Sequence, residues 1–104
     1  MKRGEIWLAD LGMTAKVRPV LVISASPNDK ERKIVTYIPR TTAIWSESRF
    51  DVSHRARGMK DGAFAVQLIG SVPKVKLFRR IAFLDDKQLA EVENTLILWL
   101  GLKN

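Results

Sequence analysis

One stretch decides the expected fold: Arg18-Pro19-Val20-Leu21-Val22-Ile23-Ser24. Its central residues, Val20 to Ile23, are all apolar, whereas a half-buried strand would alternate apolar and polar residues. A strand that is apolar on both faces must be covered on both faces. The stretch therefore predicts a strand inside a small barrel rather than one in an open single-layer sheet.

Further strand-like runs lie on both sides of this stretch, with short turn-rich segments between them. The expected strands span Glu5 to Leu8, Pro19 to Ser24, Ile34 to Ile38, Phe50 to Ser53, Ala63 to Ile69 and Val75 to Phe83. Short, closely spaced strands of this kind indicate a mainly β fold, and six or seven of them would curl on themselves.

The end of the chain changes to the period of a helix. Asp85 can cap a helix together with Gln88, and Gly101 can end it. Between them, apolar residues recur at helical spacing: Leu89, Val92, Leu96, Trp99 and Leu100. We therefore predict a C-terminal α-helix. Ile97 and Leu98 widen its apolar stripe, which either packs on the core or forms a dimer contact.

Length and composition indicate one domain over residues 1–104, because 46% hydrophobic residues can form a single core and we find no repeat or linker. The chain has no cysteine, which excludes disulfides and favours a reducing cytoplasm. The charged N-terminus, Met1 to Glu5, lacks the apolar core of a signal peptide. The longest strongly apolar stretch, Leu96 to Leu100, is far shorter than the roughly 20 residues that cross a bilayer. We expect a cytoplasmic protein that does not enter a membrane.

Charge gives the first indication of function. The chain carries 18 Lys and Arg against 11 Asp and Glu, a net charge of +7. Its pI is near 10.2, which favours a polyanionic partner, with nucleic acid as the first candidate. A solvated basic surface and an acidic protein partner are the alternatives, and charge does not distinguish DNA from RNA.

Most standard hydrolase arrangements are missing. The sequence has one histidine, no cysteine and no close group of Asp, Glu and His at metal-ligand spacing, so we expect no metal and no cofactor. His54 lies in the basic segment Ser53 to Arg57 and is expected to be an exposed loop residue. The aspartates expected in turns, where they bond to the backbone, are Asp10, Asp29, Asp51 and Asp61.

The second and third expected strands form a hairpin that brings distant residues together. Antiparallel pairing about a turn near Asp29 sets Val20 beside Pro39 and, continued outward, Arg18 opposite Thr41. A guanidinium beside a hydroxyl can hold a phosphate and stabilise charge that builds on it. The alternative is structural: Arg18 precedes a proline at a strand start, and Thr41 caps a strand end. Spacing alone leaves both interpretations open.

Three segments in the first 42 residues form a set: Lys2-Arg3-Gly4-Glu5-Ile6-Trp7-Leu8-Ala9-Asp10-Leu11, Arg18 to Ser24, and Ile38-Pro39-Arg40-Thr41-Thr42. In sequence and order they resemble the MazF/PemK toxins of type II toxin-antitoxin systems. The resemblance implies an SH3-like β-barrel of six or seven mostly antiparallel strands with a C-terminal α-helix, in a homodimer. It also implies a metal-independent endoribonuclease that cuts single-stranded RNA at short sequences and is neutralised by a cognate acidic antitoxin.

The resemblance assigns roles to individual residues. The catalytic arginine of the family falls on Arg18 and its catalytic threonine on Thr41, with the adjacent Thr42 as the alternative. In such a reaction the RNA 2′-hydroxyl attacks its own phosphate, Arg18 stabilises the pentacoordinate phosphate and Thr41 orients it. The sequence identifies no general base. The expected RNA contacts are Lys16, Arg40, Thr42, Trp45 and Gln67.

Two departures from the family pattern keep other functions open. The loop Gly12 to Val17 is shorter than in many relatives, so base preference is not transferred. Many relatives carry an acidic residue just ahead of the glutamine, where this chain has Ala65 and Val66. A noncatalytic SH3-like RNA-binding module is therefore one alternative. A gyrase-poisoning toxin of the same barrel superfamily is another, because Trp99 to Leu102 resembles the helix end on which such toxins depend.

Overall fold

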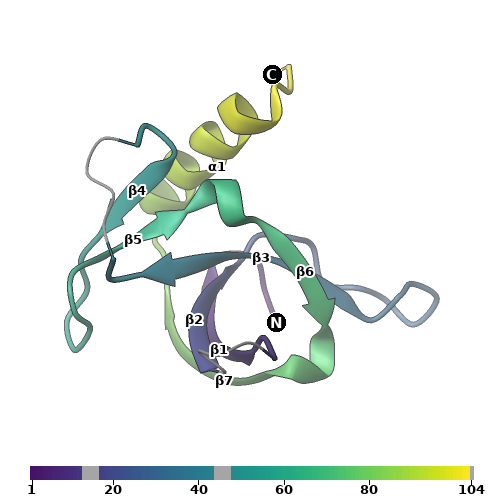
Figure 1. Cartoon of the computed structure of the whole chain (residues 1–104). Coiled ribbons are helices and arrows are strands. Elements are labelled where there is room, and N and C mark those ends of the chain that lie inside the picture. The colour runs from purple at the N-terminus through teal and green to yellow at the C-terminus, as the bar shows by residue number, and fades with distance from the viewer. Residues whose placement is uncertain (13–16, 44–47, 104) are drawn as a thin grey trace.

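The computed structural model describes residues 1–12, 17–43 and 48–103, and it confirms the mainly β fold with a C-terminal helix (Figure 1). The strands are β1 Glu5–Asp10, β2 Val17–Val22, β3 Ile34–Thr41, β4 Asp51–His54, β5 Gly62–Ala65, β6 Gly70–Pro73 and β7 Leu77–Phe83. The short 3-10 helices η1 Val66–Leu68 and η2 Lys74–Lys76 flank β6, and helix α1 spans Asp86–Leu100.

In the described residues the strands form one antiparallel sheet, with the order β4-β5-β3-β2-β1-β7 and with β6 also paired to β3. β2 lies along one edge of β3, while β6 and β5 share its other edge. The sheet curls around its interior (Figure 1). It is not closed, because the hydrogen-bonded path ends at β4 and β7. The expected barrel is thus a strongly curled open sheet.

The predicted hairpin register is confirmed. Val20 of β2 pairs with Pro39 of β3, and Val22 pairs with Tyr37. β2 is also buried on both faces, as its apolar run predicts. Val20 and Val22 pack into one buried cluster, whereas Leu21 between them packs into the other.

The predicted strand from Ala63 to Ile69 is wrong in its second half. It is interrupted by η1, which a hydrogen bond from the Ile69 amide to the Val66 carbonyl closes at 3.2 Å. The chain then forms β6, which pairs with the first half of β3. Gly70 leaves room for the Tyr37 side chain, because a Cβ there would lie 2.9 Å from the Tyr37 hydroxyl.

The predicted helix and both of its ends are confirmed. The Asp85 carboxylate accepts a hydrogen bond from the Gln88 amide (2.8 Å), and the Gln88 side chain accepts one from the Asp85 amide (3.1 Å). Gly101 ends the helix in the left-handed conformation, with φ of 68°. Val92 is fully buried against the sheet core, whereas Leu98 is half exposed. No helix among the described residues has both the length and the apolar character to span a membrane.

Candidate active site

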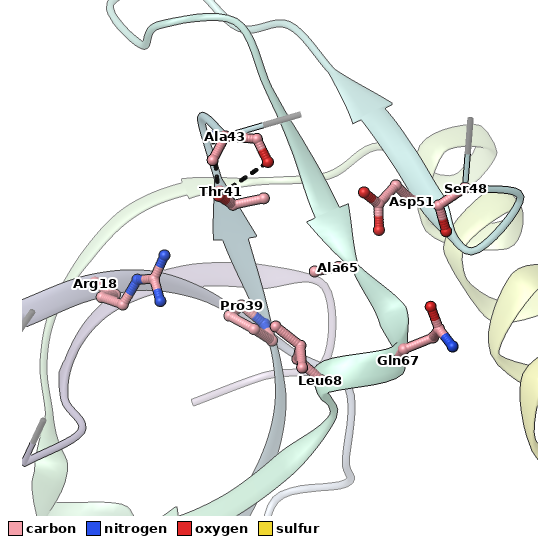
Figure 2. Close-up of a pocket in the computed structure, with 9 residues that line it drawn as sticks. All are labelled: Arg18, Pro39, Thr41, Ala43, Ser48, Asp51, Ala65, Gln67 and Leu68. Carbon is pink, nitrogen blue, oxygen red and sulfur yellow. Dashed lines mark hydrogen bonds between the residues drawn. The ribbon is translucent and has the colours of Figure 1, made fainter. Parts of the chain in front are cut away.

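A pocket of about 420 Å³ opens where β2 and β3 approach β4 and β5 (Figure 2). Its polar lining comes from Arg18, Thr41, Ser48, Asp51 and Gln67. The volume lies in the range of small-ligand sites. The pocket therefore has room for part of a nucleotide and side chains of both charge signs to contact it.

Arg18 enters the pocket from β2 and Thr41 from β3, the two residues that the hairpin register brings together (Figure 2). Each is held by a further strand: Arg18 pairs with Ala9 of β1, and Thr41 pairs with Ala63 of β5. Thr41 Oγ1 accepts a 3.0 Å hydrogen bond from the Ala43 amide. As a donor it makes only a long contact, 3.5 Å, to the Ala43 carbonyl. The hydroxyl proton can therefore turn to a phosphate oxygen.

Asp51 is a pocket residue that the sequence analysis missed. It lies in the expected strand from Phe50 to Ser53 but was grouped with the aspartates of turns; in the structure it begins β4 and pairs with Ala65 of β5. Directly paired residues of an antiparallel sheet share a face, and both line the pocket. The strand next to β5 thus supplies a carboxylate where β5 itself has Ala65. Val66 is fully buried, so an acid at that position would face the core.

Arg40 does not reach the pocket or the solvent. Only 4% of its surface is exposed, because side chains alternate along β3 and Thr41 takes the pocket side. Its Nε donates to Nδ1 of His54 at 2.9 Å, and its Nη2 donates to the carbonyls of His54 (3.0 Å) and Lys60 (2.6 Å). Burial lowers the pKa of its guanidinium, and Asp61 opposes that shift. The predicted contact of Arg40 with RNA phosphates does not fit this position.

His54 was predicted to be an exposed loop residue, and this prediction is wrong. It is the last residue of β4, is 5% exposed and lies against the Phe64 ring, with ring centroids 4.8 Å apart. Burial lowers the pKa of His54, and the positive charge of Arg40 lowers it further. The imidazole is therefore neutral, with Nδ1 as an acceptor, and it has no part in the pocket lining.

The remaining predicted contacts divide into three groups. Gln67 lies in η1 and lines the pocket, although its side chain points away from Leu68 and Arg18 in Figure 2. Thr42 is exposed just after β3 and does not line the pocket. Lys16 and Trp45 lie outside the described residues.

The geometry sets a cation and a hydroxyl donor on one side of the pocket and a carboxylate on the other. The first two suit the nonbridging oxygens of a phosphate, and the third can accept a proton. Within residues 1–12, 17–43 and 48–103, no group of three His, Asp or Glu could hold a metal ion. Together with the net charge of +7, the fold and pocket define a small basic β protein whose pocket is lined by groups that suit a phosphate.

Comparison with known proteins identifies the family. Residues 2–100 match the family model described as PemK-like, MazF-like toxin of type II toxin-antitoxin system. Because the match covers nearly the whole chain, the protein belongs to this family, and the predicted resemblance is confirmed.

Individual relatives agree with this assignment. Endoribonuclease MazF of Staphylococcus epidermidis is 26% identical over 113 residues, which cover 100% of this chain and 94% of the relative. MazE-MazF of Deinococcus radiodurans superposes with a TM-score of 0.83 at 21% identity and covers 99% of this chain and 97% of the other. A mycobacterial endoribonuclease in complex with its cognate antitoxin gives a TM-score of 0.80 at 19% identity. The match covers 100% of this chain and 96% of the mycobacterial chain. The structural matches establish the same fold.

Proposed function

We propose that the protein is an endoribonuclease toxin that cuts single-stranded RNA at specific sequences without a metal ion. The observation that carries the proposal is the shared pocket of Arg18 and Thr41, which lie 23 positions apart in the sequence and at the matching ends of two paired strands. Family membership and the endoribonuclease relative from Staphylococcus epidermidis support it.

In the proposed reaction the 2′-oxygen of a ribose attacks the adjacent phosphorus, and the bond from phosphorus to the 5′-oxygen breaks. The products are a 2′,3′-cyclic phosphate and a 5′-hydroxyl. The Arg18 guanidinium donates to the nonbridging oxygens as negative charge builds on them. Thr41 donates a hydrogen bond from its hydroxyl to an oxygen of the same phosphate and helps to keep the phosphorus in line with the attacking oxygen. DNA lacks the 2′-hydroxyl and is not cut.

Base recognition belongs to residues around this pocket. Gln67 can bond to a base edge from η1, and Thr42 can bond to the backbone beyond the end of β3. We retain Lys16 and Trp45 as a phosphate contact and a stacking residue. We do not propose Arg40 as an RNA contact, because its guanidinium is buried.

The protein partners follow from charge and exposed apolar surface. A net charge of +7 favours an acidic antitoxin. Both similar structures named above are complexes, one described as MazE-MazF and one as a mycobacterial endoribonuclease with its cognate antitoxin. We further propose a homodimer that uses the apolar end of α1, where Leu98 and Leu100 are about half exposed. The absence of cysteine supports a cytoplasmic setting.

The test is to incubate the purified protein with a mixed RNA pool in EDTA and to map the ends of the products. We expect cuts at a short recurring sequence, with cyclic phosphate and 5′-hydroxyl ends, and intact DNA of the same sequences. Arg18→Ala and Thr41→Ala should abolish the cuts. Arg79→Ala removes the same charge from an exposed position on β7 and should leave them unchanged.

Other outcomes support other functions. Cleavage that survives in Arg18→Ala would move the site elsewhere. RNA that is bound but stays intact would favour the noncatalytic module. If the protein neither binds nor cuts RNA but blocks DNA supercoiling, the gyrase-poisoning alternative is correct.

A further inference from the structure

We infer that Asp51 is the general base of this site and takes the proton from the attacking 2′-hydroxyl. This inference rests on the proposed function, because it concerns a step of that reaction. The sequence identifies no base, and the position just ahead of Gln67 carries no acid. The structure supplies a carboxylate from the neighbouring strand instead.

The position of Asp51 is fixed by strand pairing. Asp51 pairs with Ala65, and the same pairing continues through Val52 and Phe64 to the end of β4. The Phe50 carbonyl just before the strand accepts a hydrogen bond from the Val66 amide (3.1 Å). A side chain on paired strands is held more exactly than one on a free loop, which is what a proton-transfer group requires.

Asp51 faces Arg18 across the pocket. The two residues lie on the outer members of four neighbouring strands, in the order β4-β5-β3-β2, with Thr41 on β3 between them. Three strand spacings separate flat backbones by about 14 Å. The curl of the sheet and the lengths of the two side chains reduce that gap, and Figure 2 shows the two charged groups on opposite sides of it. A phosphate bound to Arg18 and Thr41 would have Asp51 on the opposite side of the same pocket, and we place the attacking ribose on that side.

Within the part of the chain that the structure describes, the Asp51 carboxylate forms no side-chain hydrogen bond or ion pair. Among the described residues, no ion pair within 4.0 Å includes Asp51 or Arg18. Two other titratable residues that the structure describes on the neighbouring segments are engaged elsewhere. Asp61 pairs with Arg55 at 3.3 Å, and His54 is buried with Nδ1 bonded to Arg40. Asp51 is the one acidic residue in the pocket lining that the structure describes.

The step balances without a further reactant. The Asp51 carboxylate accepts the 2′-hydroxyl proton while the bond from the 2′-oxygen to phosphorus forms. The bond from phosphorus to the 5′-oxygen breaks, and the departing oxygen takes a proton from water. Asp51 then returns its proton to water, so the enzyme is regenerated and no water is consumed.

The test measures single-turnover cleavage of an end-labelled RNA oligonucleotide that spans a cut site of the wild-type protein. Asp51→Asn keeps the size of the side chain and removes its ability to accept the proton, so we expect the rate to fall by about 10² to 10⁴-fold. Binding of the same oligonucleotide with a 2′-deoxy sugar at the cut site, and the thermal unfolding midpoint, should stay unchanged. Asp86→Asn, which removes an exposed acid from the first turn of α1, is the matched control and should cut normally.

A second substrate separates a base from an acid. An oligonucleotide with sulfur in place of the departing 5′-oxygen needs no proton on its leaving group. If Asp51 is the base, Asp51→Asn should still cleave this sulfur-containing oligonucleotide more slowly than the wild-type protein does. Recovery of the wild-type rate would show that Asp51 protonates the leaving group and would overturn the inference.

Three further outcomes also decide the matter. A normal rate for Asp51→Asn on the ordinary RNA overturns the role of Asp51 and leaves the proposed function standing. If Asp51→Asn weakens binding of the 2′-deoxy oligonucleotide by the same factor as it slows cleavage, Asp51 is a binding residue and not the base. Intact RNA with the wild-type protein removes both the proposed function and this inference. If Asp51→Asn does not fold, Asp51→Glu takes its place in the test. The longer side chain displaces the carboxylate, so this variant should cleave RNA more slowly and bind it equally well. A cleavage rate equal to that of the wild type would contradict the inference.

Discussion

Arg40 and His54 are joined by a 2.9 Å hydrogen bond inside the curled sheet, from Nε of the arginine to Nδ1 of the imidazole. The same guanidinium also donates to the carbonyls of His54 and Lys60. It therefore ties β3 to β4 and to the segment that leads into β5, directly beside Thr41. The buried pair holds together the strands that carry the pocket residues on their other face.

This pair makes stability depend on pH. Burial and Arg40 lower the pKa of His54 from its ordinary value of 6.5, so the unfolded chain binds a proton more readily than the folded one. The stabilisation is complete above pH 6.5 and is lost as the pH falls through the lowered pKa. We expect the thermal unfolding midpoint to be constant between pH 8 and 7 and to decrease below pH 6.5.

His54→Asn is the control for this effect. The amide oxygen can accept the Arg40 hydrogen bond but does not titrate, so the variant should be less stable at neutral pH and should lose less stability between pH 6.5 and 5. Differential scanning calorimetry on both proteins at several pH values measures how steeply each unfolding midpoint depends on pH. An equally steep dependence on pH in both proteins would mean that groups other than His54 cause the acid sensitivity.

The sequence was sufficient where structure is local. The helix could be predicted because Asp85 and Gly101 mark its ends by their own backbone preferences, and the hairpin register because one turn fixes it. The roles of Asp51 and His54 could not be predicted. Both depend on which face of β4 its pairing with β5 turns toward the core, and a shift of that register by one residue exchanges the two faces of β4.

Thr41 tests whether the hydroxyl at the end of β3 acts on the phosphate. Thr41→Val keeps the shape and the strand preference but removes the donor, and the loss of one such donor lowers kcat by about 10² to 10³-fold. Thr41→Ser keeps the hydroxyl and should retain most of the activity. Single-turnover cleavage and binding of uncleavable RNA are measured for both variants. A normal rate for Thr41→Val would reduce Thr41 to its turn contact with Ala43.

Gly62 is required by the close approach of β5 to β3. A Cβ at this position would lie 2.7 Å from Nη1 of Arg40 and 2.7 Å from the backbone carbonyl oxygen of Thr41. The carbonyl belongs to the sheet ladder and cannot move freely, so Gly62→Ala should destabilise the fold by about 1–3 kcal/mol. Urea unfolding measures this. Gly70→Ala is the matched control, because its Cβ would meet the Tyr37 hydroxyl, the end of a side chain that can rotate. Equal losses would contradict the explanation.

Glu5 connects the first strand to the last, and its charge is a second source of pH dependence. Burial raises the pKa of its carboxyl, but donors from the Lys2 amide, Arg80 and Trp7 outweigh this and lower the pKa from 4.5 to about 2. The resulting stability is present above pH 4.5 and is lost as the pH falls through about 2. Because Arg80 is largely exposed and screened by water, we expect Glu5→Gln to cost on the order of 1–2 kcal/mol at neutral pH.

Urea unfolding of Glu5→Gln at pH 7 and pH 3 separates this ion pair from general acid effects. The difference between variant and wild type should be largest at pH 7 and should shrink at pH 3, where the wild-type carboxyl begins to lose the advantage of its charge. Asp29→Asn, in the exposed turn between β2 and β3, removes the same charge and should change neither value. A Glu5→Gln protein as stable as Asp29→Asn at pH 7 would show that the three donors to Glu5 do not stabilise the sheet.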